Sequence, residues 1–407
     1  MKILFVSQHY RPEPFRLSDI CEDLVERGHE VTVLTGIPNY PEGKIYADYR
    51  NKQNRRETIE GVTVFRSYTI PRGKSTLHRI LNYFSFAISS SIGVLLGQYK
   101  AKDGSEFDCV FVNQSSPVMM AWAGMAYKNK YKKPLFLYCM DVWPDSLTVG
   151  GVKQDSLIFK LFKFISKKVY RASDYIFVTS PSFKNHFVNQ FDITEQKITY
   201  LPQYAEDLFI PDESIVNKES VDLTFAGNIG KAQNLETILK AASLIEKNTD
   251  LPKKIHFHFV GDGTELLSMK ALAHELELKS VSFYGRRSLE EMPTFYKKSD
   301  AMLVSLIGDS IVSRTIPGKV QSYMAAGKPI IGAISGDTKA IVEEANCGYV
   351  SSEQDVEQLA QNICEFSMLS IEEQKELGKQ ARSYYEKHFS KEQFMTQLEK
   401  YLREEFS

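Results

Sequence analysis

The sequence is poor in cysteine, and this excludes two kinds of small stabilised domain. Five cysteines are spread over 407 residues, at Cys21, Cys109, Cys139, Cys347 and Cys364, and none forms a Cys-x-x-Cys pair. A disulfide framework needs paired cysteines and a zinc knuckle needs closely spaced ones, so neither is expected. An odd, scattered set indicates a reducing compartment.

Long apolar runs are scarce as well. The first apolar stretch, Ile3–Val6, is too short for a signal peptide and instead predicts a buried first strand. Residues 80–99 carry no charge and have the length of a membrane-spanning helix, but they include Asn82, Gln98 and four serines. This polarity disfavours a spanning helix and leaves either a buried helix or a helix lying in the membrane interface.

Charge is unevenly distributed along the chain. The net charge is only −1, yet residues 1–205 hold 27 Lys and Arg against 19 Asp and Glu, and the remainder holds 23 against 32. The first half is therefore +8 and the second half −9. This asymmetry indicates that one domain faces an anionic partner, although chance segregation of surface charge would look the same. No nucleic acid is expected, because the charge is not concentrated in a known module.

The composition is that of a globular protein, with 43% hydrophobic and 25% charged residues, and the length suggests two domains. In the first half, apolar runs alternate with amphipathic stretches, and the expected strands are 3–6, 31–34, 62–65, 110–112, 135–138 and 175–178. The second half repeats this rhythm, with strands expected at 223–226, 255–260, 281–284, 301–306 and 330–333. Strands alternating with helices predict an α/β protein of two Rossmann-like, doubly wound domains, joined by a linker near residues 201–215.

The segment Arg314–Pro329 is the best candidate for binding phosphate. Pro317 lies where proline favours a helix start, and Gly318 allows a ligand to approach the backbone closely. Arg314 and Lys319 bracket this helix start, so side-chain charge and the helix dipole would act at one place. An ordinary connection with surface cations would have the same local pattern.

At this segment the sequence resembles a known family. Pro317–Ile331 resembles the donor-site signature of the retaining family-four glycosyltransferases with the GT-B fold. Tyr10–Thr35 resembles the opening βαβ unit of that family, and Gly36–Pro41 with Asp141–Ser146 resembles a branch that builds capsule, O-antigen or exopolysaccharide. Further fragments follow in the expected order at 225–230, 260–263 and 283–286. Each fragment alone is weak, whereas the ordered set is specific.

The resemblance implies a GT-B fold, in which two Rossmann-like domains face each other across a cleft and a C-terminal helix crosses back to the first domain. Residues 1–205 plus 386–407 would form the acceptor- and membrane-facing domain, and residues 206–385 the domain that binds the nucleotide-sugar donor. The implied reaction transfers a hexosyl or N-acetylhexosaminyl group, with retention of configuration, from a nucleotide diphosphate sugar to a polyprenyl diphosphate-linked saccharide. UDP is favoured over GDP by family frequency alone.

The resemblance also implies that no metal and no other cofactor takes part. The chain has no Asp-x-Asp motif, so the metal chelate of other sugar transferases has no counterpart. Lys319 and Arg314 are expected to stabilise the charge on the departing diphosphate, with Lys231 and Arg286 as assistants. Arg16 is either a further residue that reaches the diphosphate or a packing arginine.

Several positions depart from the family pattern. The usual Glu-x7-Glu pair reads Arg314 and Ser322, so ribose recognition must be arranged differently. Asp141 is implied to orient the acceptor hydroxyl or to stabilise an oxocarbenium-like centre, with a helix cap as the alternative. His9 is expected to be a packing residue at a strand end rather than a base. The predicted catalytic residues are thus Asp141, Lys319 and Arg314, and the predicted donor-binding residues are Arg16, Asn228, Gly230, Lys231, Gly261, Asp262, Gly285, Arg286, Pro317, Gly318, Ser322 and Tyr323.

Residues 157–172 predict a helix with one basic side. At 100° per residue, the basic stripe Lys160, Lys163, Lys167 and Arg171 falls within an arc of about 80°. The predicted core face is Ile158, Phe162, Ile165 and Val169, and Leu157 and Phe164 lie beside the basic stripe. Together with the positive first half, this pattern predicts a cytoplasmic protein attached peripherally to the anionic inner face of the plasma membrane, and a solvated basic face is the alternative.

Two other functions are compatible with this sequence. A nucleotide-sugar epimerase can use the same two-domain fold, but it would need acid and base groups in the cleft, and the sequence has no convincing cluster of them. A non-catalytic, nucleotide-binding subunit of a transferase would explain the missing Glu-x7-Glu pair. Turnover by the purified chain alone distinguishes a transferase from such a subunit.

Overall fold

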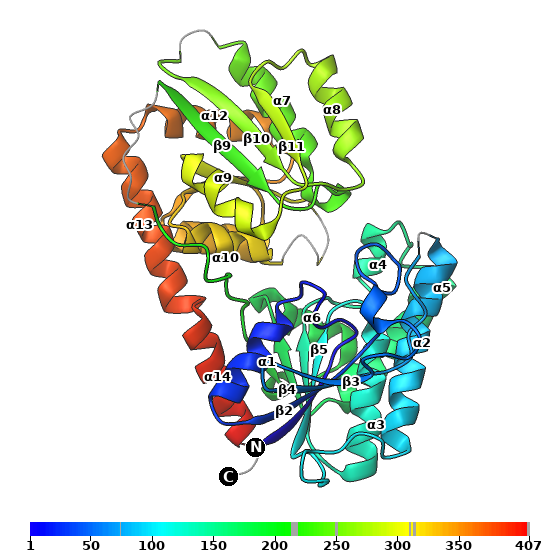
Figure 1. The fold of residues 1–407 in the computed structure, drawn as a ribbon. Helices are drawn as coiled ribbons and strands as arrows, with labels where there is room; N and C mark the ends of the chain where they lie inside the picture. Colours follow the sequence, from blue (N-terminus) through cyan, green and yellow to red (C-terminus); the bar gives the residue numbers. More distant parts are fainter. Residues whose placement is uncertain (74, 213–218, 249–250, 309–310, 312–314, 405–407) are drawn as a thin grey trace. The chain divides into compact units, whose positions relative to one another are not determined.

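The computed structural model describes residues 1–73, 75–212, 219–248, 251–308, 311 and 315–404, which form two compact units (Figure 1). The first unit comprises Met1–Thr179, Phe183–Leu201 and Glu399–Ser407, and the second comprises Ser180–Ser182 and Pro202–Leu398. Apart from Ser180–Ser182, the chain leaves the first unit at 201/202 and returns to it at 398/399, inside its last helix.

The first unit is built on a mainly parallel sheet. Its strands are β1 (Lys2–Val6), β2 (Glu30–Thr35), β3 (Arg56–Ile59), β4 (Val62–Arg66), β5 (Cys109–Gln114), β6 (Leu135–Cys139), β7 (Tyr175–Val178) and β8 (Ile198–Tyr200). They lie in the order β3-β4-β2-β1-β5-β6-β7-β8, and β3 pairs antiparallel with β4 whereas the other neighbours pair in parallel. The central strands β1, β5 and β6 are almost wholly buried, which explains their continuous apolar runs.

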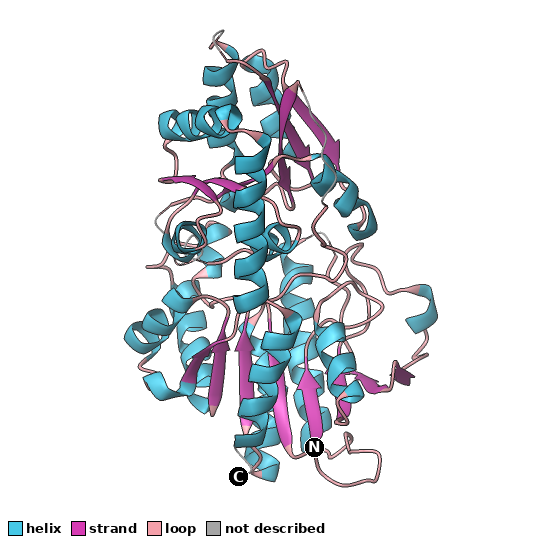
Figure 2. Cartoon of the chain, turned by 90° about the vertical axis from the view of Figure 1, so that its left-hand side faces the viewer, coloured by secondary structure: helices cyan, strands magenta, loops and turns pink. Residues whose placement is uncertain are grey.

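Helices flank this sheet on both faces (Figures 1 and 2). They are α1 (Leu17–Glu26), α2 (Thr76–Leu95), α3 (Trp122–Tyr131), α4 (Ser146–Val149), α5 (Leu157–Ala172) and α6 (Pro181–Phe191), with a 3-10 turn, η2 (Val118–Ala121), before α3. The helix α1 buries Leu17, Ile20 and Leu24, which recur at helical spacing. Gly28 follows its end with φ +86°, the left-handed conformation that terminates many helices.

The second unit contains a parallel sheet of its own. Its strands are β9 (Ser220–Ala226), β10 (Lys254–Val260), β11 (Val281–Gly285), β12 (Ala301–Ser305), β13 (Ile330–Ala333) and β14 (Gly348–Ser351), in the order β11-β10-β9-β12-β13-β14. The helices are α7 (Leu235–Glu246), α8 (Leu266–Glu275), α9 (Met292–Lys298), α10 (Gly318–Ala325), α11 (Gly336–Glu344), α12 (Val356–Met368), α13 (Ile371–His388) and α14 (Lys391–Glu404), together with the 3-10 turn η4 (Lys231–Gln233). The alternation of strands and helices predicted for this half is confirmed.

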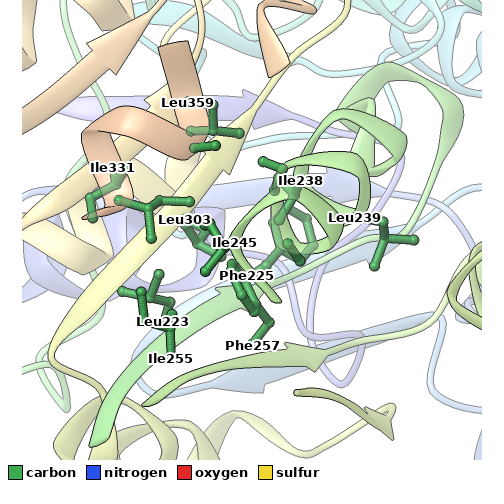
Figure 3. Packing of buried hydrophobic residues seen from close by; sticks show 14 of the residues in the cluster. Leu223, Phe225, Ile238, Leu239, Ile245, Ile255, Phe257, Leu303, Ile331 and Leu359 are labelled. Carbon is green, nitrogen blue, oxygen red and sulfur yellow. The ribbon is translucent and has the colours of Figure 1, made fainter. Parts of the chain in front are cut away.

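The core of the second unit lies between this sheet and the helices α7 and α12 (Figure 3). Phe225 and Phe257, from the neighbouring strands β9 and β10, are fully buried together with Leu303 on β12. Ile238 of α7 and Leu359 of α12 cover them. Burying side chains of this size contributes about 1.5–3 kcal/mol each, and the packing fixes the strands whose carboxyl ends bear the loops described below.

The last helix, α14, ends in the first unit. Glu399 accepts a hydrogen bond from Nη1 of Arg27 at 3.2 Å and lies 2.9 Å from Nε2 of His29. The ring of Tyr401 packs edge-on against Phe177 of β7, with 5.5 Å between the ring centroids. The C-terminal segment is thus held by the loop after α1 and by the sheet.

Each sheet has one point at which the order of the strands reverses. In the first unit this switch point lies between β1 and β5, and in the second unit it lies between β9 and β12. The loops that leave two such strands diverge to opposite faces of the sheet. Ligands of doubly wound sheets bind outside the carboxyl ends of the strands at this position, so both switch points are candidate ligand sites.

Candidate functional site

The switch point of the second unit is bordered by closely packed glycine loops. Gly227 follows β9 and Gly261 follows β10, with φ of +137° and +149°. The N–H of Gly227 donates to the carbonyl oxygen of Val260 at 2.9 Å. A Cβ on Gly261 would lie 1.8 Å from the carbonyl oxygen of Gly227, so only glycine allows these two loops to pack this closely.

Lys319 lies in the first turn of α10, beside the Gly227 loop. Its Nζ donates to Oε1 of Gln233 at 2.5 Å and lies 3.8 Å from the centroid of the Phe225 ring. A Cβ on Gly227 would be 3.2 Å from this Nζ, so the glycine leaves room for the ammonium group. Although the residue keeps partial exposure, its surroundings desolvate the ammonium and lower the pKa of Lys319 to about 7. Neither the Gln233 amide nor the Phe225 ring carries a formal negative charge. An anion that binds here would therefore stabilise the protonated form of Lys319.

The start of α10 adds backbone donors to this charge. Pro317 is the N-cap residue, with φ −66° and ψ 139°, and the helix begins at Gly318. The first N–H groups of an α-helix have no acceptor within the helix, and the helix dipole favours an anion at this end. A Cβ on Gly318 would meet Oε1 of Gln203 at 3.6 Å, an ordinary contact, so the packing of the described chain does not itself require glycine there.

Two predicted donor-binding residues on α10 have partners within the protein. The hydroxyl of Tyr323 accepts from the N–H of Ala226 and donates to its carbonyl oxygen, both at 3.0 Å, which ties α10 to the end of β9. Ser322 Oγ donates to the carbonyl oxygen of Gly318 at 3.3 Å and lies 3.5 Å from Oε2 of Glu206. The sequence did not predict a role for Glu206, because a single acidic residue in a linker has no motif and only the folded chain brings it to α10.

Five predicted donor-binding residues belong to the glycine loops themselves. The side chain of Asn228 lies against Gly230, where a Cβ would come within 2.6 Å of its Nδ2. The carbonyl oxygen of Asp262 accepts a hydrogen bond at 2.9 Å from the loop that follows β9. Gly285, at the end of β11, accepts from the N–H of Gly261 at 2.9 Å. The loops that follow three neighbouring strands are therefore joined into one edge.

The predicted cations do not all lie at this edge of the second sheet. Lys231 and Arg286 have exposed side chains, and they follow β9 and β11 at the same edge of the sheet. Arg16 belongs to the first unit, where it directly precedes α1. Arg314 lies outside the described residues. Of the predicted cations that the structure describes, Lys319 is the one whose ammonium contacts the glycine loops.

Asp141, the predicted catalytic carboxylate, lies in the first unit just beyond β6. Its Oδ2 accepts from Nε1 of Trp143 at 3.1 Å, and its backbone carbonyl oxygen accepts from Nε2 of Gln114 at 2.8 Å. Burial raises the pKa of Asp141, against hydrogen bonds that lower it. Trp143 is buried, and its Nε1 also donates to Oγ of Ser116 at 3.0 Å. Within the described ranges, no three side chains of His, Cys, Asp or Glu are grouped so that they could hold a metal ion.

Exposed apolar side chains gather on α2 and α5. They are Ile80, Leu81, Ile88, Ile92 and Leu95 on α2, Leu96 directly after it, and Leu157, Ile158, Leu161 and Phe164 on α5. We call these residues the α2–α5 surface, because both helices contact η2 and lie on the same face of the sheet. None of the helices in the described part of the chain is both long and apolar enough to cross a bilayer.

The structure corrects two expectations for α5. The sequence places Ile158 on the core face, but its side chain is 57% exposed, because the buried face, formed by Phe159, Ser166, Val169 and Tyr170, is turned away from it. The sequence also predicts a continuous basic stripe. Lys167 and Arg171 both pair with Asp192, at 2.5 and 3.0 Å, so the carboxylate neutralises part of that stripe.

The fold and the site together define a class of protein. The chain has two doubly wound units, and the second has a desolvated lysine and a helix start at its switch point. This combination is typical of two-domain α/β proteins with the GT-B fold. Sucrose-phosphate synthase from Thermosynechococcus elongatus has this fold, with a TM-score of 0.74 and 15% identity, over 100% of this chain and 99% of that one. HepE from Anabaena gives a TM-score of 0.70 and 16% identity, over 99% and 100%. The predicted fold class is confirmed.

Sequence comparison gives the family. Residues 16–203 match the family described as Glycosyltransferase Family 4, and residues 208–384 match the one described as Glycosyl transferases group 1. The chain belongs to these glycosyltransferases, as its sequence predicts. The colanic acid biosynthesis glycosyl transferase WcaI of Escherichia coli K12 is 25% identical over 80% of this chain and 82% of its own length. Glycosyltransferase WbjE of Pseudomonas aeruginosa is 26% identical over 62% of this chain and 65% of its own length.

Proposed function

We propose that this glycosyltransferase moves a sugar from a nucleotide diphosphate sugar to a lipid-linked saccharide during the synthesis of a bacterial surface polysaccharide. The name of its Escherichia coli relative refers to colanic acid biosynthesis, which supports a polysaccharide product. The solved HepE structures contain UDP, glucose or UDP-glucose, which supports a uridine nucleotide as the donor. Retention of configuration follows from the family resemblance, and the sugar is a hexose or an N-acetylhexosamine.

The observation that carries the donor assignment is the desolvated ammonium of Lys319 at the start of α10. A departing nucleoside diphosphate gains negative charge as the glycosidic bond breaks. The Lys319 ammonium, the first N–H groups of α10 and the helix dipole would all act on that charge. Arg314 is assigned the role of a second cation. With this much fixed positive charge, the reaction needs no divalent metal.

A donor screen tests this proposal. The purified full-length chain is assayed with UDP-, GDP- and dTDP-sugars, with and without EDTA, and we expect turnover of a UDP-sugar that EDTA does not reduce. Lys319→Ala should lower turnover by about 100-fold, the loss expected when one charge-stabilising group is removed. Lys240→Ala is the matched control, because Lys240 is an exposed lysine of the same unit that pairs with Glu236 on α7. Activity that is lost with EDTA and restored by magnesium would refute the metal-free assignment.

The acceptor assignment includes attachment to the membrane. The α2–α5 surface exposes ten large apolar side chains among the described residues of the first unit, which carries the positive half of the sequence. Lys160 stays exposed on α5, and Lys168 lies 4.4 Å from the centroid of the Phe164 ring. Apolar side chains that dip among headgroups, with lysines beside them, are typical of helices that lie on an anionic bilayer. A polyprenyl-linked acceptor would then be reached at the inner face of the plasma membrane.

A further inference from the structure

A buried histidine–carboxylate pair lies in the loop after β1. Nδ1 of His9 is 3.0 Å from Oε2 of Glu13, and the two side chains are 7% and 1% exposed. The other oxygen of Glu13, Oε1, accepts from the N–H groups of Asn39 and Tyr40 at 2.9 and 2.7 Å. The ring of Phe15 stacks on the His9 imidazole, with 4.7 Å between the centroids and 9° between the planes. This loop and the loop after β2 are therefore held together at the Glu13 carboxylate.

These contacts determine which nitrogen of His9 is free to bind a ligand. Oε1 of Glu13 already accepts from two backbone N–H groups, and a carboxylate can only accept, so its Oε2 is matched by a proton on Nδ1 of His9. In the neutral ring Nε2 then has a lone pair. Within the described chain Nε2 makes no hydrogen bond, although the side chain keeps some exposure. The contact with Glu13 therefore fixes both the tautomer and the orientation of the ring.

The position of the pair in the sheet gives Nε2 a function. His9 follows β1, and β1 and β5 form the switch point of the first unit, where doubly wound sheets bind ligands. We propose, on the basis of the glycosyltransferase function above, that Nε2 of His9 accepts a hydrogen bond from the attacking hydroxyl of the acceptor sugar. Glu13 is the positioning residue, because it fixes the tautomer and the orientation of the ring. The proposed role of His9 is therefore directed at the acceptor.

Two substitutions separate this role from a structural one. His9→Asn keeps an amide N–H that can donate to Glu13 and removes Nε2. Glu13→Gln keeps an oxygen for the two backbone N–H groups and turns an amide N–H toward Nδ1, which reverses the tautomer and makes Nε2 a donor. Both variants and the wild-type chain are given radiolabelled UDP-glucose or UDP-N-acetylglucosamine at pH 8. The acceptor is the membrane lipid extract of a strain that lacks this enzyme.

We expect transfer to lipid to fall about 30-fold or more in both variants, a typical loss when a group that engages the nucleophile is removed. Slow hydrolysis of the donor in the absence of lipid should stay within about twofold of the wild-type rate, as should affinity for UDP. Unchanged transfer in His9→Asn, or an equal loss of transfer and hydrolysis, would overturn the role of His9 and leave the donor assignment standing. If the wild-type chain transferred sugar to lipid from none of the sugar nucleotides of the donor screen, the proposed function itself would fail.

Discussion

The pKa of Lys319 gives the sharpest prediction for the donor site, because it makes donor affinity depend on pH. Desolvation lowers this pKa to about 7 in the free protein, whereas a bound diphosphate, as an anion, would raise it. Binding should therefore take up a proton above neutral pH. The protonated fraction of a group with pKa 7 falls from about 0.76 at pH 6.5 to about 0.03 at pH 8.5, so Kd for the sugar nucleotide should rise about 25-fold over this range.

Calorimetric titration with the donor identified by the screen measures this dependence. A sugar nucleotide is a suitable ligand because its diphosphate has no group that titrates in this pH range. Titrations in buffers of different ionisation enthalpy should also show uptake of about 0.9 proton at pH 8. Lys319→Arg keeps a positive charge that does not titrate, so its Kd should stay nearly constant. A change in Kd of less than threefold in the wild-type chain, or the same slope in Lys319→Arg, would show that another group controls binding.

The same shift has a consequence for stability with a definite sign. The unfolded chain holds the Lys319 proton up to its ordinary pKa near 10.5, whereas the folded chain releases it near 7. Between these values the unfolded state binds more protons, so the contribution of Lys319 to the free energy of unfolding increases as the pH rises. An apolar residue at this position, such as Met, should therefore stabilise the fold at pH 7 while it weakens donor binding.

Three further predictions concern packing, catalysis and the membrane. Gly261→Ala places a Cβ 1.8 Å from a carbonyl oxygen of the neighbouring loop. We expect the free energy of unfolding, measured with urea, to fall by about 3 kcal/mol or more. An unchanged urea midpoint would contradict the close packing of the two loops. Asp141→Asn keeps the shape of a buried carboxyl and should lower kcat by about 100-fold, with Kd for the donor unchanged. A near-normal kcat would show that Asp141 is not a catalytic residue. Leu161→Ser with Phe164→Ser should reduce cosedimentation with anionic liposomes at least threefold, and Leu267→Ser, an exposed leucine of the second unit, is the control. Equal binding of the wild-type chain to neutral and anionic liposomes would refute the membrane assignment.

The periodicity of the sequence predicts the elements of both units well, because their strands are short apolar runs between amphipathic helices. The helix predicted from Leu17, Ile20 and Leu24 is present as α1, and Gly28 ends it. The helix expected after Pro317 is present as α10. These features depend on residues close together in the chain, where spacing and backbone conformation are nearly independent of the rest of the fold.

The surface of α5 shows where such a pattern stops being informative. A helical wheel gives the side on which a lysine lies, but not the carboxylate that another element brings against it. Asp192 follows α6, and it pairs with Lys167 and Arg171 only because the chain folds back along α5. The exposure of Ile158 has the same origin, since the rotation of a helix is set by what it packs on.

The sequence alone therefore determined the family, the two α/β units and the glycines at the carboxyl edge of the second sheet. Each of these depends on local spacing or on backbone conformations that few residues allow. Only the tertiary structure decided the lowered pKa of Lys319, the approach of Glu206 to α10 and the pairing of His9 with Glu13. It also decided that Glu13 binds the loop after β2. Desolvation and hydrogen bonding depend on every group that surrounds a side chain, and those groups come from distant parts of the chain.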